Sequence, residues 1–147
     1  MDAPKGRLEM LAPLETENGP LEGLRLRGIA VAARREANVL FQLEYDGPGR
    51  KCEPLSRIEW RPPGLHINRD CGPWDWVNIP QIGSHHHAFE INYLDGKDTM
   101  KRNARQSAPI VPDLPDYDDL RKFVMKDFKI NGPGDTIPYP PWSEGLF

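Results

Sequence analysis

Residues 24–31 read LRLRGIAV and residues 39–45 read VLFQLEY, and these two stretches decide the fold class. In both, apolar and polar residues alternate with the two-residue period of a β-strand that buries one face. The period slips by one residue across Gly28, which predicts a bulge at the glycine. The polar residues 34–38 predict a turn between the two stretches, which therefore form a hairpin.

Three later segments add to this pattern. Residues 57–61 alternate strictly, with Ile58 and Trp60 inward, and predict another strand. The most regular alternation covers His86–Leu94, which we expect at the centre of the sheet. Residues Tyr117–Phe128 follow the 3.6-residue period instead and predict an amphipathic helix.

The number of prolines limits the length of these elements. Proline occupies 16 of 147 positions, and each one removes a backbone donor, so short strands and ordered loops are expected. We predict an α+β domain at residues 21–131, with an antiparallel sheet of about five short strands and the C-terminal helix packed on one face. Residues 1–20 are expected to form an N-terminal arm or a short helix, and residues 132–147 a tail rich in Pro and Trp.

Composition argues against several classes of protein. The longest apolar run, Ile29–Ala33, is far shorter than the roughly 20 residues of a membrane helix, and the first residues lack the pattern of a secretory signal. The net charge of −3 gives no global basic field. Cys52 and Cys71 form neither a disulfide scaffold nor a Cys-x-x-Cys pair, which favours a reducing, cytoplasmic location. The sequence has no Gly-rich phosphate loop, Gly-x-Ser-x-Gly elbow or His-Glu-x-x-His motif.

The histidines form the most distinctive cluster. All four lie between His66 and His87, and three are consecutive. Because side chains alternate along a strand, His85 and His87 are expected to share the face of the apolar residues that follow them, whereas His86 points to the other face. The third ring on the side of His85 and His87 would be His66, if its segment lies beside theirs.

Three interpretations of this cluster stay open. The histidines cap a sheet edge and are chemically idle, or they act as general acid and base on a phosphodiester whose phosphate an arginine holds, or they converge on a divalent metal, for which zinc is the natural choice. The metal-free interpretation is the first functional choice, so no cofactor is expected. Its catalytic candidates are His66, His85, His87, Arg61 and Tyr93.

Basic side chains that can contact the phosphates of a nucleic acid occur as two doublets and one strand residue. They are Arg34, Arg35, Arg57, Lys101 and Arg102. The alternative is that the doublets are solvated loop tips.

Four short motifs carry a family resemblance. They are Arg57-Ile58-Glu59-Trp60, His66-Ile67-Asn68, His85-His86-His87-Ala88-Phe89-Glu90 and the helix end Phe123–Ile130. With these motifs, residues 36–131 resemble small bacterial proteins grouped with TumE-like toxins and their uncharacterised His-x-His relatives. The resemblance implies a cytoplasmic protein from a toxin–antitoxin or mobile-element locus that acts on RNA, with His66, His85 and His87 as its candidate residues.

These observations predict a toxin-like protein that acts on RNA, for example as a metal-independent ribonuclease, with RNA or a cognate antitoxin as partner. A second prediction, from a different class, is a non-enzymatic binding or inhibitor protein of phage or mobile-element origin that blocks a host complex through its N-terminal arm, its basic loop and its tail. The third is a metal-binding protein that uses the histidine cluster.

Overall fold

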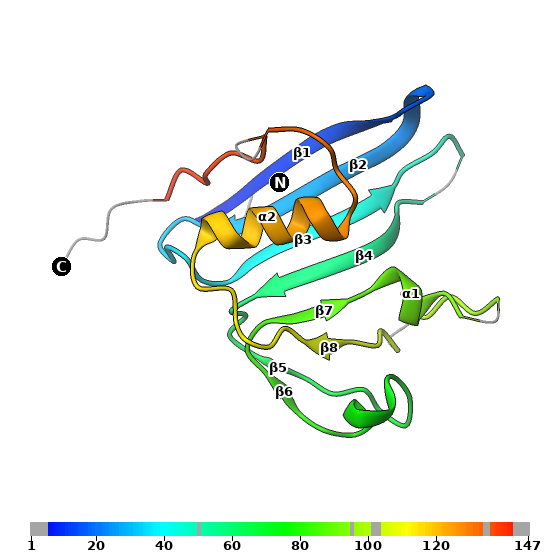
Figure 1. Cartoon of the computed structure of the whole chain (residues 1–147), viewed down its shortest axis with the longest axis vertical. Coiled ribbons are helices and arrows are strands. Elements are labelled where there is room, and N and C mark those ends of the chain that lie inside the picture. The colour runs from blue at the N-terminus through cyan, green and yellow to red at the C-terminus, as the bar shows by residue number, and fades with distance from the viewer. Residues whose placement is uncertain (1–5, 50, 95, 101–103, 134–135, 143–147) are drawn as a thin grey trace.

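The computed structural model describes residues 6–49, 51–94, 96–100, 104–133 and 136–142. Six strands form one sheet in the order β1-β2-β3-β4-β7-β8, and all neighbouring strands are antiparallel (Figure 1). They are β1 (Arg7–Thr16), β2 (Gly19–Val31), β3 (Val39–Tyr45), β4 (Glu53–Trp60), β7 (His85–His87) and β8 (Ala108–Pro109). A second sheet pairs β5 (Leu65–His66) with β6 (Gln81–Ile82). The mostly antiparallel α+β class is as predicted, but the sheet has more strands than the five expected.

Strand β1 corrects the prediction of an arm or a short helix near the N-terminus. Its side chains alternate between exposed and half-buried, with Leu8, Met10 and Leu14 toward the core. Pro13 is tolerated because β1 is an edge strand, where a missing backbone donor breaks no ladder bond on the free side. The register of β1 against β2 shifts between Pro13 and Glu15. Pro13 therefore lies in an edge strand and at a register shift, where it is compatible with regular structure.

Gly28 is not a bulge, contrary to the prediction. It pairs with Met10 on one side and Phe41 on the other, and neither register shifts there. A Cβ at this position would lie 3.1 Å from Cε1 of Phe41. The core-facing series of β2 continues through the glycine as Leu26 and Ala30, so the glycine makes room for the Phe41 ring, and the apparent phase slip arises because it has no side chain.

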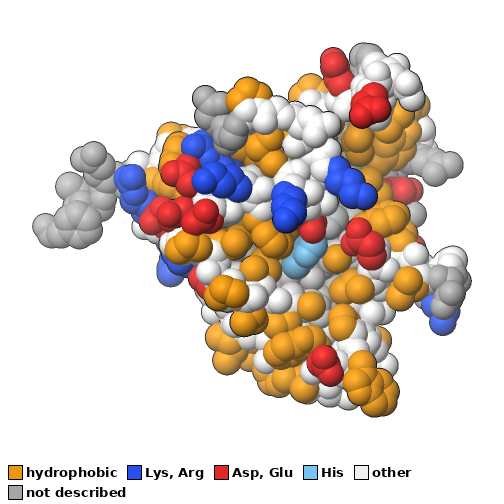
Figure 2. Space-filling model, viewed as in Figure 1, with side chains coloured by type: hydrophobic (Ala, Val, Ile, Leu, Met, Phe, Trp, Pro, Cys, Tyr) orange, Lys and Arg blue, Asp and Glu red, His pale blue; other side chains and the backbone are white. Residues whose placement is uncertain are grey.

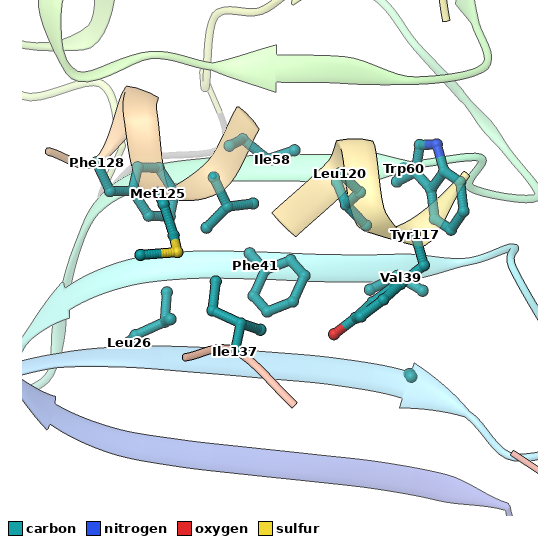
Figure 3. Packing of buried hydrophobic residues seen from close by; sticks show 12 residues of the cluster. Leu26, Val39, Phe41, Ile58, Trp60, Tyr117, Leu120, Met125, Phe128 and Ile137 are labelled. Atoms are coloured by element: carbon teal, nitrogen blue, oxygen red, sulfur yellow. The ribbon is translucent and has the colours of Figure 1, made fainter. Parts of the chain in front are cut away.

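Helix α2 (Tyr117–Asp127) covers one face of β2, β3 and β4 (Figures 1 and 3). Asp116 caps it by accepting a hydrogen bond from the backbone N–H of Asp119 at 2.9 Å. Leu120 and Val124 are fully buried, and burial of each such side chain contributes about 1.5–3 kcal/mol. The core cluster comprises Leu26, Ala30, Val39, Phe41, Ile58, Trp60, Tyr117, Leu120, Val124, Met125, Phe128 and Ile137. The predicted helix and its packing on the sheet are confirmed.

The opposite face of the sheet carries a layer of polar and charged side chains. Glu44, which is 1% exposed, accepts hydrogen bonds from Arg25 Nε at 2.7 Å, Arg27 Nε at 2.9 Å and Gln42 Nε2 at 2.7 Å. Arg27 also pairs with Glu9 on β1. Burial alone would raise the pKa of Glu44, but these hydrogen bonds, led by that of Arg27, outweigh it and lower the pKa to about 2. The sheet thus has one apolar and one ionised face.

The described part of the tail, residues 136–142, forms neither helix nor strand, as its prolines predict. It packs against α2. Ile137 is buried in the core, Tyr117 Oη donates to the carbonyl of Pro138 at 2.7 Å, and Tyr139 Oη donates to Asp118 at 2.5 Å. These contacts join the start of the tail to the same core as the helix.

The segment that follows the three histidines differs from its prediction. Strand β7 ends at His87, and helix α1 (Phe89–Asn92) replaces the rest of the expected central strand. The Asn92 side chain explains the bend, because it donates to the carbonyl of Ala88 at 2.8 Å and accepts from the backbone N–H of Gln106 at 2.9 Å. These bonds satisfy backbone groups that a strand would have paired. Strands β3 and β4, not residues 86–94, form the middle of the sheet.

Strands β5 and β6, with the 3₁₀ helix Trp74–Trp76 between them, form a small lobe below β8 in Figure 1. Hydrophobic side chains gather on the surface at this end of the molecule (Figure 2). The exposed large ones of this lobe are Leu65, Trp74, Ile79 and Ile82. Across the part of the chain that the structure describes, none of the helices has the length and apolar character needed to cross a membrane.

Candidate metal centre

The pairing of β4 with β7 decides where the histidines point. His85 lies opposite Glu59, His86 opposite Ile58 and His87 opposite Arg57. Residues that pair across neighbouring strands share a face of the sheet, so His85 and His87 lie on the ionised face and His86 on the helix face. There, His86 Nε2 is 2.9 Å from Asp127 Oδ2 of α2. The prediction that His85 and His87 continue the apolar face is wrong, because the chain turns into α1 before the alternation can continue.

His66 reaches the same place from β5. Its ring centroid lies 5.5 Å from that of His85 and 4.8 Å from that of His87, and the latter two are 5.1 Å apart. Asn68 holds this segment in position: its Nδ2 donates to the carbonyl of Ser107 at 2.7 Å, and its Oδ1 accepts from the N–H of Ser107 at 2.8 Å. The three rings therefore come together from two separate sheets.

His85 and His87 each face a hydrogen-bond acceptor at both ring nitrogens. Nδ1 of His85 lies 3.0 Å from the carbonyl oxygen of Gly83, and Nδ1 of His87 lies 3.2 Å from that of Gln106. A neutral imidazole carries one hydrogen and satisfies one of its two contacts, whereas a protonated ring satisfies both. Both Nε2 atoms face one carboxylate oxygen, Oε2 of Glu59, at 2.8 Å and 3.0 Å.

Asn68 fixes the tautomer of His66. Its Nε2 lies 2.9 Å from Oδ1 of Asn68. Because Ser107 fixes the orientation of the Asn68 amide, that atom is the accepting oxygen, and Nε2 of His66 is the donor. The lone pair of His66 is on Nδ1. In each ring one nitrogen lies against a backbone carbonyl or the Asn68 amide, as in metal-binding histidines, and the second nitrogen of His85 and of His87 faces Glu59.

The pKa values of the two buried rings, His85 and His87, shift in opposite directions. Burial lowers the pKa of His85, but the hydrogen bond to Glu59 and the carbonyl of Gly83 outweigh it, so the net pKa is raised. For His87, burial prevails and lowers the pKa to about 4. Burial raises the pKa of Glu59, yet its bonds to the two imidazoles bring the net value well below the usual range. A single proton therefore goes to His85 before His87, and Glu59 stays ionised.

The donor atoms lie at distances that a metal ion can bridge. One ring nitrogen from each of His66, His85 and His87 lies within 4.8 Å of the others. Zinc–nitrogen bonds of about 2.0–2.1 Å in a tetrahedral site place neighbouring donors roughly 3.3 Å apart. The distances from Glu59 to the two Nε2 atoms are already close to that value.

Two of the predicted catalytic residues lie elsewhere. Arg61 binds Asp113 at 2.9 Å and stacks on the Trp60 ring, with its guanidinium carbon 4.5 Å from the ring centroid. Tyr93 Oη donates to the carbonyl of Pro54 at 2.6 Å, and burial, aided by Asp98, raises its pKa to about 12. Both are structural contacts, and within the described residues neither side chain is hydrogen-bonded to a histidine.

Three of the predicted nucleic-acid contacts are described by the structure, and they do not share one surface. Arg57 lies on the ionised face beside His87, where its Nε and Nη2 donate to Oε1 of Gln42 at 3.0 Å and 2.7 Å. Arg34 and Arg35 are exposed in the β2–β3 connection, and Arg35 lies over Trp142. Lys101 and Arg102 fall outside the described residues. Of the three described, only Arg57 lies beside the histidines.

Glu59 is the site residue that sequence reasoning missed. Its outward direction was predicted from the alternation with Ile58 and Trp60, which the structure confirms. Its role depends on the pairing of β4 with β7, and a single sequence does not reveal that pairing. The one signal for Glu59 in the sequence is that a carboxylate occupies an outward position of a strand in a chain that also has a His-x-His motif.

Comparisons with protein-family models, curated proteins and solved structures give no match to this chain. The resemblance to TumE-like toxins therefore stays a prediction, and function is inferred from the geometry of the site.

Proposed function

We propose that the protein binds a divalent transition metal, zinc in the first instance, through His66, His85, His87 and Glu59. The observation that carries this proposal is the pair of Nε2 atoms that face Glu59 Oε2 at 2.8 Å and 3.0 Å, in rings whose Nδ1 atoms lie against backbone carbonyl oxygens. Imidazole and carboxylate are both good ligands for zinc.

The chemistry of this contact calls for a cation. Each of these rings meets an acceptor at both nitrogens, and a neutral imidazole has a hydrogen for only one of them. Protonation satisfies both contacts of His85, whose pKa is raised, but the low pKa of His87 leaves one of its contacts without a hydrogen at neutral pH. A metal ion relieves the contacts of both rings with Glu59 at once, and it adds the lone pair of His66.

The metal-free acid–base function on RNA is the second candidate. The opposite pKa directions of His85 and His87 favour it, because an acid–base pair needs two groups that titrate apart. However, both residues are only 3% exposed, and a general acid or base must reach its substrate within a hydrogen-bond length. Metal binding needs no such access for either ring, so it is the function that the geometry supports better.

The experiment compares metal uptake between faces of the same strand. Purified untagged protein is stripped with a chelator, reloaded with zinc, desalted and assayed by elemental analysis. We expect one zinc per chain, and loss of it in His85→Ala and in His66→Ala. His86→Ala is the matched control, since this residue is next to His85 in sequence but points to α2, and it should keep its zinc.

Two outcomes would overturn the proposal. One is the absence of stoichiometric zinc, and of cobalt when it replaces zinc, in folded wild-type protein. The other is equal loss of metal in His86→Ala and His85→Ala, which would show that the strand and not the cluster is responsible. Folding of each variant is checked by circular dichroism.

The role of Glu59 is tested by Glu59→Gln, which keeps the shape of the side chain but removes its charge. If Glu59 is a ligand, the affinity for zinc falls by at least the roughly 10- to 100-fold that the loss of an outer-shell partner costs in such a site. The visible spectrum of the cobalt-loaded protein changes as well, because one oxygen donor is altered.

A further inference from the structure

A hollow beside the histidine cluster is lined by basic side chains. His66 belongs both to the cluster and to the wall of this hollow. Arg69 and Arg105 line it as well, with Leu65, Ile67 and Cys71 as further wall residues. A molecule that fills the hollow therefore lies against one of the proposed metal ligands and against two arginine side chains.

Arginines outnumber carboxylates around this corner, where Asp70, next to Arg69 in sequence, accepts from Nδ2 of Asn78 at 3.0 Å. Arg57, on the neighbouring strand, directs two N–H groups to the neutral oxygen of Gln42. Arg105 gives its Nε–H to the backbone carbonyl of Met100 at 2.9 Å. Among the described residues, no carboxylate forms an ion pair with Arg57, Arg69 or Arg105, and the one acidic group of the cluster, Glu59, faces the histidines.

A bound metal makes this excess larger. A divalent ion carries two positive charges and Glu59 one negative charge, so the metal centre is positive. The two arginines of the hollow add further positive charge. Guanidinium groups offer paired N–H donors that match the oxygens of carboxylates and phosphates. Of these anions, a phosphate monoester carries up to two negative charges near pH 7, whereas a carboxylate or a phosphodiester carries one.

We propose that this hollow binds the terminal phosphate group of a phosphate monoester, between Arg69 and Arg105 and beside the metal. This inference rests on the proposed metal site, because the ion supplies part of the positive charge. It names the class of ligand that the metal centre serves, and it assigns to Arg69 and Arg105 a binding role that the sequence did not predict.

The test uses cobalt-loaded protein and inorganic phosphate as the probe. Phosphate that binds beside paramagnetic cobalt shows a broadened ³¹P resonance, and the dependence of line width on protein concentration gives the affinity. We expect Arg69→Gln and Arg105→Gln each to weaken binding by about 10-fold, as for loss of a charge-assisted hydrogen bond. Arg34→Gln is the control, because Arg34 is exposed as Arg69 is but lies in the β2–β3 connection, and it should bind as the wild type does.

Competition identifies the kind of phosphate. Methyl phosphate should displace inorganic phosphate, and dimethyl phosphate, which carries one charge, should compete at least 10-fold less well. Equal competition by dimethyl phosphate would overturn the assignment of a monoester and point to a diester such as RNA.

Cobalt content is measured on the same samples, so that the two proposals fail separately. Protein that takes up no cobalt contradicts the proposed function. Protein that holds cobalt but leaves the ³¹P line unchanged at millimolar phosphate contradicts only the present inference. Arginine variants that bind phosphate as tightly as Arg34→Gln does would contradict it in the same way.

Discussion

Replacing Glu44 by Gln tests whether the ionised face of the sheet stabilises the fold. The carboxylate is 1% exposed and accepts from Arg25, Arg27 and Gln42. Glutamine has nearly the same shape and imitates the protonated acid, so the change removes the charge and leaves the packing intact. Both guanidinium groups then lose the carboxylate that they share.

The lowered pKa gives the magnitude. The pKa of Glu44 falls from 4.5 to about 2, and each pKa unit corresponds to about 1.4 kcal/mol, so ionisation of Glu44 stabilises the folded state by about 3 kcal/mol at pH 7. This agrees with the roughly 3–5 kcal/mol lost when one partner of a buried ion pair is removed. Because the folded pKa is depressed, the contribution is complete above about pH 4.5 and is lost as the pH falls through about 2.

Urea denaturation of the wild type and of Glu44→Gln, at pH 7 and at pH 3, measures this contribution. The difference in free energy of unfolding should be about 3 kcal/mol at pH 7 and about half of that at pH 3. Glu9→Gln is the matched control, since Glu9 also pairs with Arg27 but is 39% exposed, and an exposed pair contributes about 0–1 kcal/mol. If Glu44→Gln costs no more than Glu9→Gln, or if its cost does not shrink at pH 3, the ionised face does not stabilise the fold in this way.

Three further predictions concern the core and the histidines. Leu120→Ala should lower the free energy of unfolding by about 2–5 kcal/mol in thermal or urea melts, and Phe123→Ala by less, because Phe123 is only partly buried; equal costs would contradict the packing of α2. Gly28→Ala should destabilise by about 1–3 kcal/mol in the same melts, because the new methyl group meets Phe41 at 3.1 Å, and a neutral result would show that the ring moves freely. If the protein acts on RNA as predicted from its sequence, its expression should arrest growth and degrade cellular RNA, and the double variant His85→Ala with His87→Ala should do neither; arrest that persists in that variant would remove the histidines from the activity.

Local patterns predicted the elements that bury an apolar stripe. The alternation at residues 39–45 and 57–61 and the helical period at Tyr117–Phe128 match β3, β4 and α2, because each follows directly from the burial of one face. The same rule indicates β1 from Leu8, Met10 and Leu14, but the prolines around them predict irregular structure. A proline at a sheet edge costs little, and a sequence does not say which strand is the edge.

The site depended on contacts between distant segments. The sequence indicated that His85 and His87 share a face and that His66 approaches them, and the structure brings these rings together. It did not indicate which face, because the alternation of residues 88–94 imitates a strand while Asn92 bends the chain into α1. It did not indicate Glu59 either, since that contact follows from the register of β4 against β7.

Strand β7 consists of three histidines, so its own sequence does not determine how it aligns with β4. Sliding the strand by one position would keep a histidine opposite two of the three partners, yet it would exchange the imidazole under α2 for one from the ionised layer. The alignment must therefore be fixed from outside the run. Ser84 provides this anchor, since its hydroxyl accepts from the N–H of Arg61 at 3.0 Å and donates to Asp113 at 2.5 Å. A hydroxyl one residue before the histidines thus determines which of them can face a ligand.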